Sequence, residues 1–186
     1  MLNARVMKKS IFIILLGICQ LSHAQSQETN QTVGFELDAL PYIANGYYGS
    51  VWYGRNQMRY RAVITKITTP DFMLDNGFTN NDMYVYALIT EYFFKPDFKG
   101  WWIGTGLEYW NADIQTDAKQ ETSQYDNYIF TIGSGYVWKF YRNFYLNPWI
   151  AGHLRIAGDD EVTVDDMNFK PARFIPEISM KIGWHF

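Results

Sequence analysis

The chain has 186 residues, a formal net charge of -3, and a composition that is 48% hydrophobic and 18% aromatic but only 19% charged. This mildly acidic balance gives no reason to expect a nucleic acid as partner. After residue 24 the sequence contains no apolar run long enough for a membrane-spanning helix. The only cysteine, Cys19, lies in the N-terminal apolar run, so we expect the mature chain to use no disulfides.

The N-terminal region predicts export. Residues 7–24 read MKKSIFIILLGICQLSHA, in which two lysines precede an apolar run that ends in a small-residue cleavage site. This pattern is typical of a secretory signal peptide, which we place at 1–24, with Met7 as the more natural start. We expect a short N-terminal segment at 25–32 and one domain at 33–186.

The rest of the chain alternates apolar and polar residues with a period of two, which predicts eight β-strands. They span residues 33–43, 47–55, 57–69, 83–95, 100–113, 126–140, 144–157 and 172–186. No stretch shows the 3.6-residue period of an amphipathic helix, so we expect no helix.

Six of the strands have one apolar face and one mixed face, and the mixed faces together carry charges of both signs. The alternation weakens between residues 47 and 69. On the last strand the apolar face consists of Ile178, Met180, Ile182, Trp184 and Phe186. The residues that we expect to form a charge network on the mixed faces are Glu36, Asp38, Arg59, Arg61, Glu91, Glu108, Lys139, His153, Arg155, Arg173, Glu177, Lys181 and His185.

Alternation by itself fits two kinds of barrel. A soluble, lipocalin-like barrel buries the apolar face, whereas a transmembrane barrel turns it to lipid. The strands are long, their apolar faces end in aromatic residues, and long connections at 69–82, 112–126 and 157–171 alternate with short ones. These features favour an all-β fold, an eight-stranded antiparallel up-and-down transmembrane β-barrel with a polar interior and a lipid-facing apolar exterior.

Two details do not fit this pattern simply. Pro41 and Pro176 fall inside the first and last predicted strands, near the closing seam, where proline removes a donor from the ladder. We expect a local bulge there. Lys66 falls on the lipid side, where it either reaches the headgroups or indicates a register error of one residue.

An export signal, eight amphipathic strands and a last strand ending in Phe186 resemble the small outer-membrane β-barrels of Gram-negative bacteria, with the architecture of OmpX and the OmpA transmembrane domain. The resemblance covers about residues 30–186. It implies location in the outer membrane. It also implies that Ile178, Met180, Ile182, Trp184 and Phe186 form the signal read by the barrel-assembly machinery.

We assign no catalytic, metal or cofactor site from the sequence. Outer-membrane lipid A deacylases use a Ser-His-acid site, but Ser134 lies on the face opposite to the inward-facing His153. The acidic run at 158–166 offers oxygen ligands suited to calcium, yet its spacing is not that of an EF-hand loop. We expect the interior charges to pair as a plug, with a proton or ion path as the alternative.

These expectations together favour a non-enzymatic integral outer-membrane barrel that acts as a structural or interaction protein through its extracellular loops. A narrow channel for small solutes and a lipid-modifying enzyme are the alternatives. The expected partners are outer-membrane lipid, the barrel-assembly machinery and an unidentified extracellular or membrane partner, with no nucleic acid and no cofactor.

Overall fold

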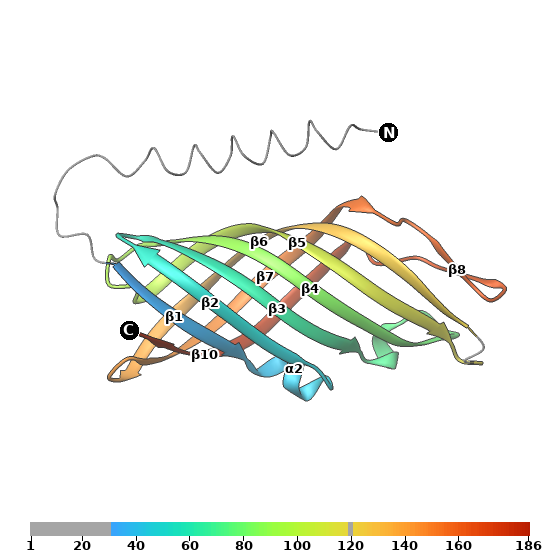
Figure 1. Ribbon diagram of the computed structural model, residues 1–186, viewed down its shortest axis with the longest axis horizontal. Coiled ribbons are helices and arrows are strands. Elements are labelled where there is room, and N and C mark those ends of the chain that lie inside the picture. The colour runs from blue at the N-terminus through green and yellow to red at the C-terminus, as the bar shows by residue number, and fades with distance from the viewer. Residues whose placement is uncertain (1–30, 119–120) are drawn as a thin grey trace, which may run out of the picture.

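Eight antiparallel strands close into a barrel in the computed structural model, which describes residues 31–118 and 121–186 (Figure 1). The strands of the barrel are β1 (Gln31–Asp38), β2 (Tyr47–Arg55), β3 (Met58–Thr69), β4 (Phe78–Phe93), β5 (Gly100–Thr116), β6 (Thr122–Tyr141), β7 (Phe144–Gly158) and β10 (Phe174–His185). Successive strands pair, and β1 pairs with β10 to close the ring. The predicted eight-stranded up-and-down architecture is confirmed. The predicted signal peptide lies outside the described residues.

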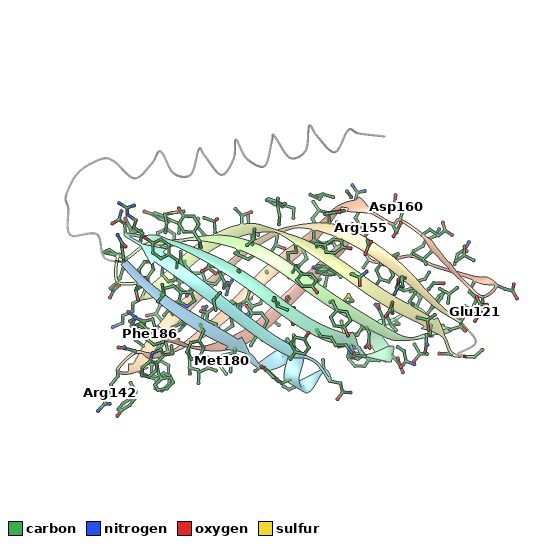
Figure 2. All side chains as sticks on the ribbon, in the orientation of Figure 1. Glu121, Arg142, Arg155, Asp160, Met180 and Phe186 are labelled. Atoms are coloured by element: carbon green, nitrogen blue, oxygen red, sulfur yellow. The ribbon has the colours of Figure 1, made fainter. Side chains whose placement is uncertain are left out.

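The two ends of the barrel differ. At the turn side, short turns join β2 to β3, β4 to β5 and β6 to β7, and the start of β1 lies beside the end of β10. Asn56 and Arg142 adopt positive φ in two of these turns. The loop side carries the 3₁₀ helix η2 (Asp71–Met73) and the hairpin of β8 (Val162–Val164) and β9 (Met167–Phe169). In Figure 2, Arg142 marks the turn side and Glu121 the loop side.

The expectation of no helix is wrong at one place. Residues 39–43, which we predicted as strand, form the short helix α2 (Ala39–Ile43). Asp38 ends β1 and caps this helix, because its side chain accepts a hydrogen bond from the Leu40 N–H at 3.1 Å. Pro41 lies early in α2, where a missing N–H costs little, so a helix replaces the expected bulge at this proline.

The predicted long loops are shorter than expected, because the strands continue into them. β4 begins at Phe78, β5 reaches Thr116, and the third loop folds into the β8–β9 hairpin. An apolar cluster at the loop side supports this extension: Phe78 packs on Phe169, with ring centroids 5.1 Å apart. Tyr125 joins the cluster and donates a hydrogen bond to Asn81 at 2.9 Å. Burial raises the pKa of Tyr125 to about 12, which keeps this donor protonated.

The outer surface of the barrel is apolar across its middle and aromatic at both margins. The turn-side aromatic belt contains Tyr92, Phe94, Trp101, Trp138 and Phe140, and the loop-side belt contains Tyr47, Tyr86 and Tyr128, all exposed. Exposed aliphatic side chains between the belts include Val51, Ile64, Leu88, Leu107, Ile132, Ile150 and Ile178. Lys66 faces outward at the loop-side margin, where it pairs with Asp82 at 3.0 Å, so the register expected for this strand holds.

Candidate functional site: the barrel interior

The turn-side half of the lumen contains a cluster of four charged side chains from three strands. Glu36 of β1 accepts from Arg59 at 3.0 Å and from Arg61 at 2.6 Å, both on β3. Glu91 of β4 pairs with Arg61 at 2.6 Å and also with Arg59. All four residues are buried. The period of two places them on the inner face, and the register sets Arg59 directly opposite Glu91.

Polar and aromatic side chains complete this cluster. The Tyr145 hydroxyl and the Asn147 amide donate to Glu36 at 3.0 and 3.1 Å. Trp52 donates to the Tyr145 hydroxyl at 2.8 Å, and Trp102 donates to Asn147 at 2.9 Å. A buried charge is tolerated only when it is paired and hydrogen-bonded, and these donors add to the two arginines as partners of the Glu36 carboxylate.

Aromatic side chains fill the lumen between these ion pairs and the turns. The buried cluster here consists of Trp52, Phe93, Phe98, Trp102, Val137 and Tyr145. The Arg59 guanidinium lies 4.9 Å from the Phe93 ring centroid and 5.2 Å from that of Trp52, within cation–π range. We call the four charged residues and this aromatic cluster the floor of the lumen.

Lys181 lies beside the floor with an incomplete set of partners. Its Nζ atom is 3.7 Å from Asp38 and 3.1 Å from the ring centroid of Trp149. Asp38 in turn accepts hydrogen bonds from Trp149 at 2.9 Å and from Ser179. The Lys181 ammonium itself makes no hydrogen bond to any residue that the structure describes, although only 1% of the residue is exposed.

A second polar cluster lies on the opposite wall, nearer the loop side. The His153 ring contacts Glu108 at 3.3 Å and Glu177 at 2.9 Å. Thr131 donates to Glu108 at 2.7 Å and lies 2.9 Å from Nδ1 of His153. Trp110 donates to the other oxygen of Glu108 at 2.7 Å. Four strands, β5, β6, β7 and β10, thus supply one hydrogen-bonded set centred on His153.

The proximity of a hydroxyl to His153 was missed from the sequence, where only Ser134 was considered. Ser134 donates to the Trp102 carbonyl oxygen at 2.7 Å and does not reach His153. Thr131 is the residue directly opposite His153 in the β6–β7 register, a relation that the inward positions of both strands indicate once the register is known. Its hydroxyl proton is already committed to Glu108, so His153 has no free hydroxyl to activate.

Four of the predicted network residues lie outside these clusters. At the turn side, Lys139 donates to the Asp97 carbonyl at 2.5 Å, and His185 lies against Trp52 with ring centroids 6.3 Å apart. At the loop side, Arg155 pairs with Asp160 at 3.0 Å (Figure 2).

The assignment of Arg173 to the interior is wrong. Arg173 is exposed, because β10 begins only at Phe174 and leaves it in the preceding loop. Arg155 also departs from the expected network, since its long side chain reaches the acidic loop rather than the lumen.

Acidic side chains of the run at 158–166 make contacts within the protein itself. Asp160 pairs with Arg155, Asp159 accepts from the Asp126 N–H at 2.9 Å, and Asp165 accepts from Thr116 at 2.5 Å. Across residues 31–118 and 121–186, no group of three or more histidine, cysteine or acidic residues is arranged to hold a metal ion.

A cavity of about 770 Å³ lies above the floor, in the loop-side half of the lumen. Its lining is largely apolar and includes Val63, Val85, Ala87, Ile89, Trp110 and Ile129. Arg61 and Lys181 line its deep end, and Glu108, His153 and Glu177 line its side. Ile43, Phe72 and Met73 line its mouth and are themselves exposed.

Comparison with known proteins gives one distant structural likeness. No protein-family model matches the chain, and no curated protein matches it. Among solved structures the chain is similar to the crystal structure of Neisserial surface protein A (NspA), with 14% identity over 84% of this chain and 95% of that chain, and a TM-score of 0.49. The chain's own strands form a closed eight-stranded β-barrel.

Proposed function

We propose that the chain is a non-enzymatic integral protein of the bacterial outer membrane, a barrel that acts as a structural or interaction protein through its loop side. The observation that carries this proposal is the continuous outward apolar surface between two aromatic belts. Such a surface is costly in water, and a closed barrel is one of the only two structures that can cross a bilayer.

The height of the apolar surface fits a bilayer. From Trp138 to Tyr128, the belt residues of β6, the strand advances about 33 Å at about 3.3 Å per residue. A tilt of about 40° reduces this to about 25 Å along the barrel axis. Outer-membrane barrels carry an apolar band of about 25 Å flanked by aromatic girdles. No helix in the described part of the chain is long and apolar enough to cross a membrane.

The interior favours a closed barrel rather than a narrow channel. The floor joins four buried charges in mutual ion pairs and backs them with six packed side chains, most of them aromatic. An ion would have to separate these pairs to pass, at high cost in a low-dielectric site. The polar set around His153 is internally hydrogen-bonded, which supports a non-enzymatic role.

The loop side supports an interaction role. Phe72 and Met73 are 87% and 64% exposed on η2, beyond the loop-side belt. Exposed apolar side chains on a surface that faces water are typical of contact sites. We place the partner surface on these loops.

We further propose that β10 carries the pattern read by the barrel-assembly machinery. Its outward positions Ile178, Met180, Ile182 and Phe186 are all exposed, and Trp184 packs on Phe186 with ring centroids 6.4 Å apart. A Phe186→Ala variant is expected to be exported normally but to insert poorly. Equal amounts of wild type and variant in isolated outer membranes would contradict this role.

The main proposal is tested by folding the purified chain in detergent. We expect heat-modifiable migration on a gel, β-rich circular dichroism and no steady conductance in planar bilayers. A chain that stays folded and monodisperse without detergent would refute the membrane location. A steady open conductance would instead favour the channel.

A further inference from the structure

We propose that the loop-side cavity binds one long-chain carboxylate, with the acid group against Lys181 and Arg61 and the hydrocarbon chain along the apolar wall. This inference goes beyond the proposed function, because it assigns a ligand-binding site to the lumen.

The cavity has the size and lining of a ligand site. Its volume of about 770 Å³ lies within the range of about 300–1,000 Å³ typical of small-molecule pockets. Val63, Val85, Ala87, Ile89 and Ile129 all line it, so most of its wall offers a chain of methylene groups only apolar contact. A hydrophobic wall with few polar groups at one end is the pattern of a site for an amphiphile.

Its length suits an acyl chain. Lys181 and Phe174, both on β10, line the deep end and the outer part of the cavity. They are about 23 Å apart along the strand at about 3.3 Å per residue, or about 18 Å along the axis at a tilt of about 40°. One leaflet of a bilayer whose core is about 30 Å thick reaches about 15 Å, so a membrane-lipid chain fits with its head group.

The deep end presents cationic atoms that lack hydrogen-bond partners. Nζ of Lys181 and Nε of Arg61 are buried and make no hydrogen bond within the described residues. Both residues line the cavity, whereas the carboxylates that pair with them, Glu36, Glu91 and Asp38, do not. Unsatisfied buried donors are costly, and an acceptor placed above them removes that cost.

These donors select an anionic head group. A carboxylate accepts from both cations in charge-assisted hydrogen bonds, whereas an amine would face two positive charges. The acidic residues of the side wall do not compete for that place. Glu108 and Glu177 both contact His153. Glu177 lies about 13 Å from Lys181 along β10 at about 3.3 Å per residue, which places it about 10 Å nearer the loop side at a tilt of about 40°.

The closing seam offers the ligand a side route into the cavity. The Arg155 N–H donates to the Arg173 carbonyl and the Phe186 N–H to the Val33 carbonyl, so even-numbered residues of β10 turn their backbone groups toward β1. The β1 ladder ends at Asp38 opposite Lys181, so Pro176 has no strand partner on that side. A proline without an N–H fits this unpaired position.

Helix α2 stands beside this gap and carries part of the cavity lining. Leu40 and Ile43 of α2 and Phe174 of β10 line the cavity, yet they are 38%, 81% and 58% exposed. The cavity therefore reaches the outer surface of the barrel between α2 and β10, which lie next to each other in Figure 1.

The proposal is tested by native mass spectrometry of the folded, detergent-solubilised chain with palmitate and with hexadecanol, which shares the chain but lacks the charge. We expect one palmitate per barrel and at least about tenfold weaker binding of hexadecanol. Lys181→Met should weaken palmitate about tenfold and leave hexadecanol unchanged. Lys139→Met, at the turn side and away from the cavity, should change neither.

A second pair of variants tests the cavity without touching any charge. Ala87→Phe fills the lumen and should abolish binding of both probes, whereas Ala62→Phe on the adjacent strand faces outward and should leave binding intact. Equal affinity of wild type for palmitate and hexadecanol would overturn the anionic assignment. Unchanged palmitate binding by folded Ala87→Phe would overturn the site itself. Gel mobility before and after heating identifies variants that fold.

Discussion

The two halves of the lumen are built on the same strands but filled in different ways. In the turn-side half, long and bulky side chains such as Arg59, Trp52 and Trp102 meet across the axis and leave no room. In the loop-side half, inward positions of the same strands carry Val63, Ala87 and Val85, which are too short to meet, and a cavity remains. An eight-stranded barrel is only just wide enough for side chains to fill, so the size of each inward residue decides whether a section is solid or hollow.

The difference also separates two kinds of stabilisation. The floor depends on ion pairs that share carboxylates, so one substitution there leaves several groups without a partner. The wall of the cavity is stabilised by contacts between apolar side chains. A substitution of one of them is expected to leave the contacts of the others largely unchanged. Four substitutions in the lumen and one outside it, ordered by expected effect, test whether the halves differ in this way.

The largest effect is expected from Glu36→Gln. The substitution removes the negative charge shared by Arg59 and Arg61 and leaves two buried cations with Glu91 alone. We expect the free energy of unfolding to fall by about 3–5 kcal/mol. Urea titration in lipid vesicles, followed by tryptophan fluorescence, measures it. Asp160→Asn, whose carboxylate is 94% exposed, is the control that should leave the value unchanged. A Glu36→Gln protein as stable as wild type would show that the floor is not held by its ion pairs.

His153→Phe should have the next largest effect. It removes the ring that separates Glu108 from Glu177, and the buried Glu108 keeps only Thr131 and Trp110 as donors. We expect a loss of about 2–3 kcal/mol in the same titration, because a charged group loses one of its hydrogen bonds in a buried place. The loss should stay below that of Glu36→Gln, since the Glu177 side chain is 23% exposed and can turn to water. The reverse order would place the principal stabilising cluster in the loop-side half.

Gly183→Ala tests how tightly the turn-side half is packed. A Cβ atom at Gly183 would lie 2.2 Å from Cζ of Tyr145, whose hydroxyl holds Glu36 and Trp52. The ring must shift, and we expect a loss of about 1–2 kcal/mol. Gly49→Ala is the matched control, because a Cβ there meets nothing within 4 Å. Equal stability of the two variants would mean that the packing of the turn-side half adjusts to an added methyl group at little cost.

The corresponding change in the loop-side half is Ala87→Leu. Its added atoms extend into the cavity, so we expect the free energy of unfolding to stay within about 0.5 kcal/mol of wild type. A loss as large as that of Gly183→Ala would indicate that the loop-side half is as tightly packed as the floor.

The smallest effect is expected outside the lumen. Asp82→Asn breaks the pair with Lys66 at the loop-side margin, where both side chains are partly exposed. We expect a change of about 0.5 kcal/mol or less, which disappears at high salt. The difference between low-salt and high-salt titrations measures it. A salt-independent loss of unfolding free energy above that value would show that this pair is a principal contributor to the stability of the barrel.

Several features of the barrel follow from the sequence because they are local. The period of two marks each strand and separates its faces, so the number of strands and the inward position of Glu36, Arg59 and Glu91 can be read without knowing which strands pair. Turn lengths between strands are equally local. The eight-stranded order was predicted for this reason, and β2 (Tyr47–Arg55) even has the predicted bounds.

Other features depend on what lies across the barrel, and only the tertiary structure decided them. Whether 39–43 continued as strand depended on the pairing of β1 with β10, which ends at Asp38 opposite Lys181. The contact of Thr131 with His153 required the β6–β7 register. The cavity depends on the combined size of the inward side chains that all strands place at one level of the barrel. The sequence of a single strand does not show this. Alternation specifies a face, but packing across the lumen specifies what that face meets.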